Sequence, residues 1–323
     1  VTESLGISNH AKVLDIGSND GLLISKFKEL GCDVVGIDPS EYATSISKNK
    51  GLDTHVAYFN SESSAMLLSR YGKFDLITAN NVFSHADDLT EFAESVEKIL
   101  SDEGVFVFEV SYLLDLVDRN LLDYVYHEHL CHHSVKPLRD FMDRCGLRLV
   151  NVERVVVKGG SIRCYAVKST SAICAENTVE EMIQYELDSG LYKHDTYAGL
   201  RAKFKDLKVG IKNAIERELS NGGKIAAYGA SATSTVLSYL LDMNKYLSFI
   251  VDDNKGRQGR LSPGYMIPVH SSSDLLDHMP AIVIISAWRF ADEIISKNKS
   301  YLEKGGVFLI PSPNLGTIRY VNS

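Results

Sequence analysis

The sequence predicts an α/β protein with two domains, each built on a mainly parallel sheet. Short apolar runs alternate with segments at helical period from Lys12 to about Leu147, which is the pattern of a βαβ series. The same alternation begins again after Asn221-Gly-Gly-Lys224. At 323 residues the chain is long enough for two domains that each bury a core.

The first domain is expected to span residues 1–170 and to be Rossmann-like. Its parallel strands are predicted at the buried apolar runs Val13–Ile16, Val34–Ile37, Asp75–Ala79 and Val105–Glu109. Later antiparallel strands are predicted at 147–152, 155–157 and 161–167, with Gly159 and Gly160 in a tight turn. These strands would complete the first sheet.

Residues 171–221 are expected to form a helical connector, because apolar residues recur there at near-helical intervals. A second, smaller Rossmann-like α/β domain is expected over residues 222–323. It begins with a strand, a small-residue turn and a helix over 225–236, and its further strands are predicted at 249–252, 281–286 and 307–310.

Composition argues against several classes of protein. The formal charge of −8 and the pI near 5.7 argue against nucleic acid as a partner, because nucleic-acid binders present a basic face. No apolar run reaches about 18 residues, and the first residues lack the features of a signal peptide, so we expect a cytoplasmic protein without membrane contact. The five cysteines are scattered and never spaced C-x-x-C, which favours neither a disulfide framework nor a four-cysteine zinc site. The oligomeric state stays open.

A cofactor turn is predicted at Asp15-Ile-Gly17-Ser18-Asn-Asp-Gly21, between the first strand and an amphipathic helix. It matches the dinucleotide pattern G-x-G-x-x-G poorly: if Gly21 is the last glycine, the first two fall on Ile16 and Ser18. The carboxylate of Asp15 just before the turn suits a cationic ligand better than a pyrophosphate.

Asp38 follows the second strand and precedes Pro39, which closes it. A carboxylate there can accept hydrogen bonds from the two hydroxyls of a ribose. Together with Asp15, it favours S-adenosyl-L-methionine as the cofactor. The alternative is a structural strand-turn-helix with solvated carboxylates.

The chain resembles the sugar C-methyltransferase family over nearly its whole length. The resemblance is carried, in order, by Asp15-Ile-Gly-Ser-Asn-Asp-Gly21, Ala79-Asn-Asn-Val-Phe-Ser-His85, Tyr126-His-Glu-His129, Gly159-Gly-Ser-Ile-Arg163, Tyr228-Gly-Ala230, Gln258-Gly-Arg-Leu-Ser-Pro-Gly264 and Ala287-Trp288. The first is shared by many methyltransferases, whereas the combination is specific. The resemblance implies methyl transfer from S-adenosyl-L-methionine to a ring carbon of a nucleotide-diphosphate-linked keto-deoxysugar, with contacts to the cofactor from Asn80 and Asn81.

The chain departs from that family in two respects. Family members commonly begin with a small cysteine-rich zinc domain, which this sequence does not show. The family also often has a lysine where this chain has Thr233, so we expect Lys224, Lys255 or Arg257 to supply the phosphate contact instead.

C-methylation requires a base that removes the proton next to a carbonyl and a partner for the resulting enolate oxygen. The segment Tyr126-His127-Glu128-His129 offers imidazoles, whose ordinary pKa near 6.5 suits this task. The resemblance implies that His129 is the base, with Glu128 and Tyr126 near the sugar, and that His85 faces the same site. In an extended strand, 127 and 129 would share one face and 126 and 128 the other, so a combined site requires a bend.

Two other interpretations of this histidine-rich stretch remain. His127, His129, Cys131, His132 and His133 could hold a metal, but the zincin spacing fails and the set is dense for a tetrahedral site, so we expect no metal. The histidines could instead cap loops through hydrogen bonds to the backbone.

The second domain is expected to bind the nucleotide part of the substrate. Lys255, Arg257 and Arg260 concentrate positive charge in turn-rich loops, which suits a diphosphate, although a solvated loop is the alternative. The turn that contains Tyr228, Gly229 and Ser231 opens a helix whose amides can bind an anion.

Ser161 and Arg163 are also expected to contact the substrate. For Trp288, packing in the core and stacking on a base are equally compatible with the sequence. Rival functions are an O- or N-methyltransferase of the same fold, a non-catalytic nucleotide-sugar-binding module, and a nicotinamide oxidoreductase.

Overall fold

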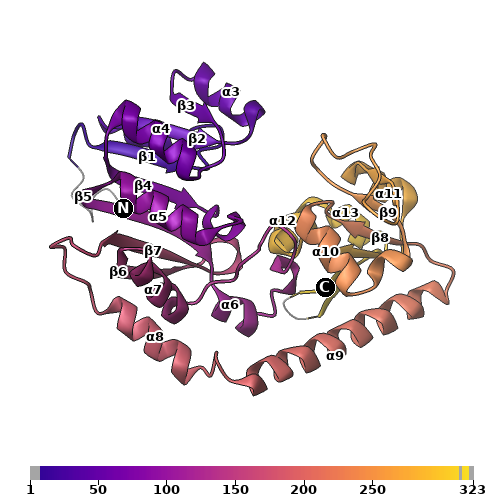
Figure 1. Ribbon diagram of the computed structural model, residues 1–323. Coiled ribbons are helices and arrows are strands. Elements are labelled where there is room, and N and C mark those ends of the chain that lie inside the picture. The colour runs from indigo at the N-terminus through magenta and orange to yellow at the C-terminus, as the bar shows by residue number, and fades with distance from the viewer. Residues whose placement is uncertain (1–7, 313–314, 320–323) are drawn as a thin grey trace. The chain divides into compact units, whose positions relative to one another are not determined.

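The computed structural model describes residues 8–312 and 315–319 (Figure 1). It divides into two compact units. The first comprises Val1–Leu114 and Glu128–Tyr192, and the second comprises Asp115–His127 and Lys193–Ser323.

The first unit holds a seven-stranded sheet in the order β3-β2-β1-β4-β5-β7-β6. Its strands are β1 (Lys12–Ile16), β2 (Asp33–Asp38), β3 (Asp53–Val56), β4 (Phe74–Asn80), β5 (Leu100–Ser111), β6 (Leu147–Val155) and β7 (Ser161–Lys168). Strands β1 to β5 pair in parallel, whereas β7 is antiparallel to both β5 and β6. The helices are α2 (Leu22–Glu29), α3 (Glu41–Asn49), α4 (Ser61–Tyr71), η1 (Phe83–His85), α5 (Leu89–Ile99), α7 (Val135–Arg144), η3 (Val157–Gly159) and α8 (Thr178–Asp188).

Both faces of this sheet are buried, and successive side chains along each strand point to opposite faces. Val107 packs on the face that Phe27 of α2 covers. Its neighbours Phe106 and Phe108 point the other way, where their rings contact Phe83 of η1. Because the parallel strands are buried on both faces, their sequences are continuous apolar runs.

Side-chain caps define where helices begin in the first unit. The Ser40 hydroxyl accepts the amide of Ala43 at the start of α3, and Asn60 forms a capping box with Ser63 at the start of α4. Asp88 accepts two amides of the first turn of α5.

The second unit holds a six-stranded sheet in the order β10-β9-β8-β11-β12-β13, with β13 antiparallel to β12. Its strands are β8 (Ile225–Tyr228), β9 (Leu247–Val251), β10 (Val269–His270), β11 (Ile282–Ile285), β12 (Val307–Ile310) and β13 (Gly316–Arg319). Its helices are η2 (Leu122–Tyr124), α9 (His194–Leu219), α10 (Ala232–Leu240), η4 (Met243–Lys245), η5 (Ser272–Asp274), α11 (Leu275–His278), η6 (Trp288–Phe290), α12 (Ala291–Lys297) and α13 (Lys299–Glu303). Helix α6 (Leu113–Asp118) begins in the first unit and ends in the second.

The core of the second unit also has two layers. Ile225 and Ala227 of β8 pack with Ile215 of the long helix α9, visible in Figure 1. The intervening Ala226 packs with Tyr301 of α13 on the opposite face. This arrangement confirms the predicted fold class, an α/β chain with two Rossmann-like sheets.

Three details differ from the sequence expectations. Strand β6 ends at Val155, and residues 157–159 form η3, so the predicted strand at 155–157 is wrong. The expected connector is divided, because α8 belongs to the first unit and α9 to the second. Helix α8 is held in the first unit by its buried Glu186, since the Glu186 carboxylate accepts the amides of Val135 and Lys136 at the start of α7.

The third difference is the segment Asp115–His127, which belongs to the second unit although its sequence neighbours belong to the first. The fully buried carboxylate of Asp123 accepts a hydrogen bond from Arg289 at 2.6 Å and one from the indole nitrogen of Trp288 at 3.1 Å. The Arg289 guanidinium lies over the rings of Tyr124 and Trp288. This network explains Trp288 as a packing residue of the second unit.

Candidate functional site

A cavity opens at the carboxyl ends of β1, β2 and β4 in the first unit. Its volume is about 440 Å³. The strand order reverses between β1 and β4, the position where open α/β sheets bind ligands. Six of the predicted site residues line this cavity: Gly17, Asp38, Pro39, Asn80, Asn81 and His85.

Gly17 allows the turn after β1 to pass close to the chain after β4. Its φ of 74° lies in the left-handed region, and its amide donates to the carbonyl of Ile37 at 2.8 Å. A Cβ at this position would lie 2.3 Å from Cγ2 of Val82, so no side chain fits there without displacing Val82.

Asp38 is held as a hydrogen-bond acceptor at the cavity wall. Its carboxylate accepts the amide of Asn19 at 3.0 Å through one oxygen and the amide of Ser40 at 2.8 Å through the other. Each carboxylate oxygen has a further lone pair. A carboxylate with these free lone pairs can accept the two hydroxyls of a ribose.

Asp15 and Ser18 are buried and are not among the residues that line the cavity. Asp15 is 4% exposed, and one of its carboxylate oxygens accepts a hydrogen bond from Thr78 at 2.6 Å. Burial raises the pKa of Asp15 to about 7, against the opposing hydrogen bond from Thr78 and with help from the charge of Asp38. The structure thus places Asp15 as a buried support of the turn.

The segment that contains Glu128 and His129 does not continue as an extended strand, because residues 126–128 form a bend and a turn. After the turn, the amide of Leu130 donates to the carbonyl of Ser84 at 3.1 Å, which attaches this segment to η1. The rings of His129 and His85 then lie 5.2 Å apart at an angle of 30°. The structure therefore brings two predicted catalytic histidines together at the edge of the cavity.

The neighbouring histidines have different surroundings. The rings of His132 and His129 lie 6.1 Å apart, and burial followed by the charge of His129 lowers the pKa of His132. His133 is buried against the ring of Phe83, and burial lowers its pKa to about 4. His133 is thus a neutral core residue.

Tyr126 and His127 belong to the second unit, whereas Glu128 and His129 belong to the first. The predicted catalytic set is therefore divided between units, and the chain passes from one to the other inside the motif. The tyrosine and histidine rings of positions 126 and 127 are 5.9 Å apart.

Several cavity residues escaped the sequence analysis. Asn19, the stretch Ala57–Phe59, Val82 and Phe92 also line the cavity. Residues 57–59 directly follow β3, the third parallel strand. Their position at the carboxyl end of that strand is the signal that could have identified them. Phe59 and Phe92 form an edge-to-face pair with centroids 4.9 Å apart, which gives the cavity an aromatic wall.

Ser161 and Arg163 lie on β7 of the first unit and line neither of the two large cavities. Ser161 is fully buried and its hydroxyl donates to the carbonyl of Val157 at 3.2 Å. Arg163 forms ion pairs with Glu109 at 3.1 Å and Glu153 at 3.6 Å. These contacts are those of sheet residues.

A second cavity, about 430 Å³ by the same measure, lies at the carboxyl ends of β8, β9 and β11 in the second unit. Four predicted substrate residues line it, namely Tyr228, Gly229, Ser231 and Arg257. Four charged residues that the sequence analysis did not select also line it, namely Asp252, Asp253, Glu293 and Lys297.

The charges around the second cavity are largely paired. Arg257 lies 3.1 Å from Asp252, which also accepts the amide of Ala230 at 2.7 Å. Lys297 lies 2.7 Å from Glu293 and 3.5 Å from Asp253. The arrangement of Asp252 after the second strand parallels that of Asp38 in the first unit.

The other predicted basic contacts lie elsewhere. Lys255 and Arg260 are exposed and do not line the cavity. Lys224 precedes β8 and so lies at the opposite, amino end of that strand, which excludes it as the replacement for a lysine at Thr233. The Thr233 hydroxyl is 3.1 Å from that of Ser231, and Arg257 is the predicted substitute that reaches the cavity.

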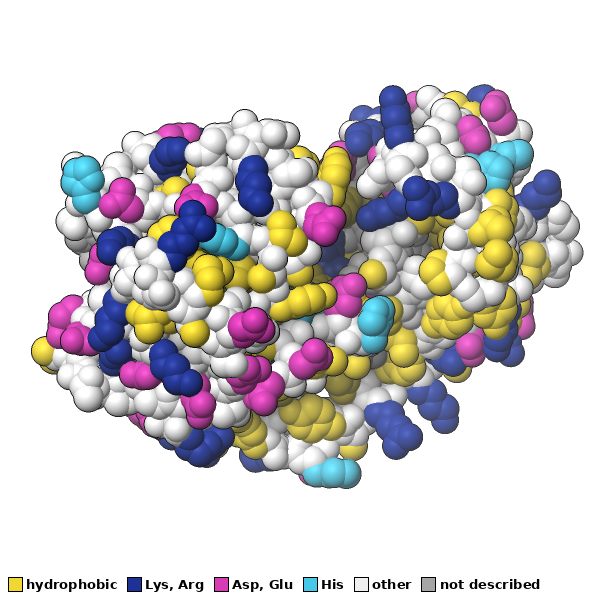
Figure 2. Space-filling view, turned by 45° about the horizontal axis from the view of Figure 1, so that its top comes forward, with side chains coloured by type: hydrophobic (Ala, Val, Ile, Leu, Met, Phe, Trp, Pro, Cys, Tyr) yellow, Lys and Arg dark blue, Asp and Glu magenta, His cyan; other side chains and the backbone are white. Residues whose placement is uncertain are grey.

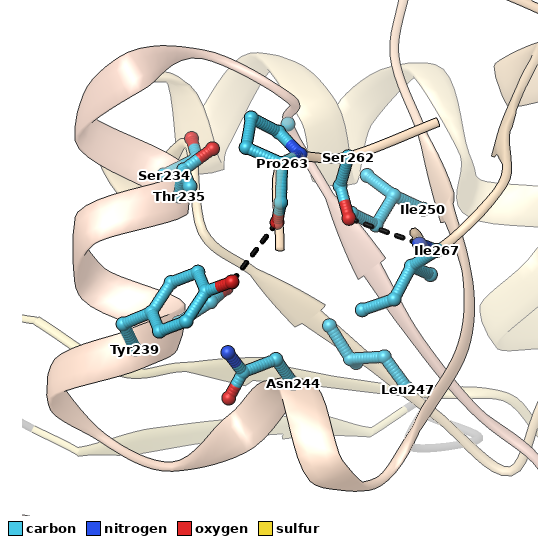
Figure 3. A pocket seen from close by; sticks show the side chains of 11 residues that line it. Ser234, Thr235, Tyr239, Asn244, Leu247, Ile250, Ser262, Pro263 and Ile267 are labelled. Carbon is cyan, nitrogen blue, oxygen red and sulfur yellow. Dashed lines mark hydrogen bonds between the residues drawn. The ribbon is translucent and has the colours of Figure 1, made fainter. Parts of the chain in front are cut away.

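A third pocket, behind Gly229, measures only about 10 Å³ and is shown in Figure 3. The Tyr239 hydroxyl donates to the carbonyl of Pro263 across its mouth, and the hydroxyl of Ser262 accepts the amide of Ile267. The space is that of about one water molecule. It is a packing feature and not a substrate site.

The surface carries both signs of charge. Figure 2 shows acidic and basic side chains interspersed over the face that it displays. Among the described residues, no helix is long and apolar enough to cross a membrane.

Comparisons with known proteins agree with this geometry. A family model described as "Methyltransferase domain" matches residues 3–152, and one described as "C-methyltransferase C-terminal domain" matches residues 156–313. The C-methyltransferase NovU of Streptomyces niveus is 30% identical over 312 residues, which cover 96% of this chain and 74% of that protein.

More distant matches cover only part of the chain. A ubiquinone biosynthesis O-methyltransferase of Rhodopseudomonas palustris is 29% identical over 105 residues, 32% of this chain and 42% of that protein. A crystal structure of magnesium protoporphyrin IX methyltransferase from Synechocystis with bound S-adenosylmethionine matches with 14% identity and a TM-score of 0.39, over 52% of this chain and 74% of that one.

The two family models together span almost the whole chain, and the relative that matches 96% of this chain is named a C-methyltransferase. The chain therefore belongs to the family of S-adenosylmethionine-dependent C-methyltransferases.

Proposed function

We propose that this protein methylates a ring carbon of a nucleotide-diphosphate-linked keto-deoxysugar through an enolate. The observation that carries the proposal is the pair His85 and His129 at the edge of the cofactor cavity, with ring centroids 5.2 Å apart. A carbon acid needs a base beside the methyl donor, and imidazole suits that role at neutral pH.

Bound S-adenosyl-L-methionine supplies a methyl group on a positively charged sulfur. Asp38 binds the ribose hydroxyls, and the turn at Gly17 with Asn80 and Asn81 encloses the rest of the cofactor. His129 accepts the proton from the carbon next to the ketone. The electron pair left on that carbon is delocalised as the enolate and would then form the new carbon–carbon bond to the methyl group. The methyl–sulfur bond would break with its electrons left on sulfur, so that S-adenosylhomocysteine is released.

His85 is placed to donate a hydrogen bond to the enolate oxygen, because it lines the cavity and lies beside His129. Glu128 and Tyr126 remain proposed substrate contacts on the strength of the family resemblance.

The second unit supports binding of the nucleotide part. Its cavity meets the amino end of α10, where the helix dipole favours an anion, and Arg257 lines the same cavity. Because Asp252 already pairs with Arg257, a diphosphate would compete with that carboxylate.

The test of the enolate is proton exchange. Wild-type protein with S-adenosylhomocysteine in D₂O, given nucleoside-diphosphate 4-keto-6-deoxyhexoses that carry each common base, should exchange the hydrogen next to the ketone. His129→Asn should lose exchange and methylation by about 10²- to 10⁴-fold, the usual contribution of a general base. His127→Asn, an exposed histidine of the same turn, is the matched control.

Methylation by wild-type protein without any exchange would refute the enolate. Exchange by His129→Asn at the wild-type rate would refute the assigned base. Carbon NMR of the product separates C-methylation from O- or N-methylation.

Nucleotide binding is tested by calorimetry with UDP, dTDP and GDP. Arg257→Ala should weaken the preferred diphosphate about tenfold, whereas Lys304→Ala, an exposed cation of the same unit, should not. Equal binding by both variants would remove Arg257 from the site.

A further inference from the structure

Three possible metal ligands converge in the second unit, in a segment that the proposed chemistry does not use. His270 ends β10, Asp274 ends η5 and His278 ends α11, at intervals of four residues. One ligand atom of each lies within 4.8 Å of the others.

The cluster is close to the geometry of a tetrahedral ion. Ligand atoms bound at about 2.0–2.1 Å in tetrahedral geometry are about 3.3–3.4 Å apart. Nδ1 of His270 and Oδ2 of Asp274 are already 3.3 Å apart. His278 is exposed at the end of its helix, so rotation of its side chain can bring the third ligand closer.

The surroundings also resemble those of metal sites, where neighbouring groups orient the ligands and exclude water. The other carboxylate oxygen of Asp274 accepts a hydrogen bond from the Ser273 hydroxyl at 3.2 Å. The buried ring of Phe249 lies 5.4 Å from that of His270 and 5.0 Å from that of His278, which gives the cluster an apolar wall.

We propose that His270, Asp274 and His278 bind one divalent transition-metal ion of the Zn²⁺ class, with water completing its coordination. Two imidazoles and one carboxylate suit such ions, whereas Ca²⁺ and Mg²⁺ prefer oxygen ligands alone. This site is independent of the proposed methylation chemistry.

The ion would brace the wall of the second cavity. The carbonyl of His270 accepts the amide of Asp252 at 3.1 Å, and the Ser272 hydroxyl donates to Asp253 at 2.6 Å. Both aspartates line that cavity. Fixing β10 to α11 through a metal would therefore stabilise the backbone that positions them.

The test uses the whole chain after treatment with EDTA, titrated with ZnCl₂ by calorimetry and with CoCl₂ by visible absorption. We expect one ion per chain, and a rise of about 5–10 °C in the unfolding temperature of the second unit at a hundredfold excess over Kd. Asp274→Asn and His278→Ala should each weaken binding at least 30-fold. Because His278 is exposed, its variant should fold and unfold like the wild-type apoprotein.

Two variants serve as controls. His194→Ala removes an exposed histidine of the same unit, and Cys131→Ser alters the separate histidine-rich stretch of the first unit. Both should bind as the wild type does. The proposal is overturned if the wild type binds no metal up to 1 mM, or if Asp274→Asn and His278→Ala bind the metal as tightly as the wild type. Loss of the ion in Cys131→Ser would also overturn it.

Discussion

Replacing Asp15 by Asn should make the stability of the first unit less sensitive to pH. The carboxyl group is 4% exposed, and burial raises its pKa from an ordinary 3.8 to about 7. Asn has nearly the same shape, can still accept the hydrogen bond from Thr78, and does not ionise.

The magnitude follows from the difference in proton binding. Between about pH 4 and pH 7 the unfolded chain releases the proton of Asp15 while the native state retains it. The stabilisation from the protonated form is thus complete below the unfolded pKa and is lost as the pH rises through about 7. At about 1.4 kcal/mol per pH unit, the loss between pH 5 and pH 8 is about 3 kcal/mol.

The assay is urea unfolding from pH 5 to pH 8, with the first unit followed by hydrogen exchange of peptides from β1 and β4. The free energy of unfolding of Asp15→Asn should rise relative to the wild type by about 3 kcal/mol over this range. Fluorescence of Trp288, the single tryptophan, reports the second unit and should show no such difference.

Asp33→Asn removes a carboxylate from an exposed position of the adjacent strand and controls for the loss of one negative charge. If the free energy of unfolding of Asp15→Asn minus that of the wild type stays constant or falls as the pH rises, the assignment of a buried, protonated Asp15 is refuted.

Two further substitutions test the contacts that shape each unit. Asp38→Asn replaces a carboxylate that accepts two backbone amides, so it should weaken S-adenosylhomocysteine about 10- to 100-fold in calorimetry; a change below threefold would separate Asp38 from the cofactor. Asp123→Asn leaves the Arg289 charge largely buried without its partner, and should cost the second unit about 3 kcal/mol in urea unfolding followed by Trp288 fluorescence. If the double variant Asp123→Asn/Arg289→Met loses as much free energy of unfolding as the two single variants together, the two residues are not coupled.

The cofactor turn illustrates what local sequence can reveal. The apolar run before Gly17, the glycines that allow the turn, and Asp38 at the end of the next strand are all signals within about 25 residues. Their geometry depends mostly on the topology of a parallel sheet, which the alternation of elements predicts. The structure brings Gly17, Asp38, Pro39 and Asn80 to one cavity for that reason.

The role of Asp15 shows the limit of the same reasoning. Sequence placed a carboxylate next to the turn, but which way its side chain points depends on the pleat of β1 and on Thr78 of the neighbouring strand β4. In the structure it is buried and accepts the hydrogen bond from Thr78. The neighbouring sequence could therefore not show whether Asp15 contacts a cationic ligand directly.

The sequence by itself determined the fold class, the order of the elements and the acidic and glycine positions of the first cavity, because these depend on periodicity and turn chemistry. Only the tertiary structure decided which residues far apart in sequence meet. It joined Asp123 to Arg289, placed His129 beside His85, and divided the Tyr126–His129 motif between two units. It also brought His270, Asp274 and His278 close together, because the chain turns after β10 to form η5 and α11. Such contacts arise from packing across elements, for which neighbouring residues in the sequence carry no signal.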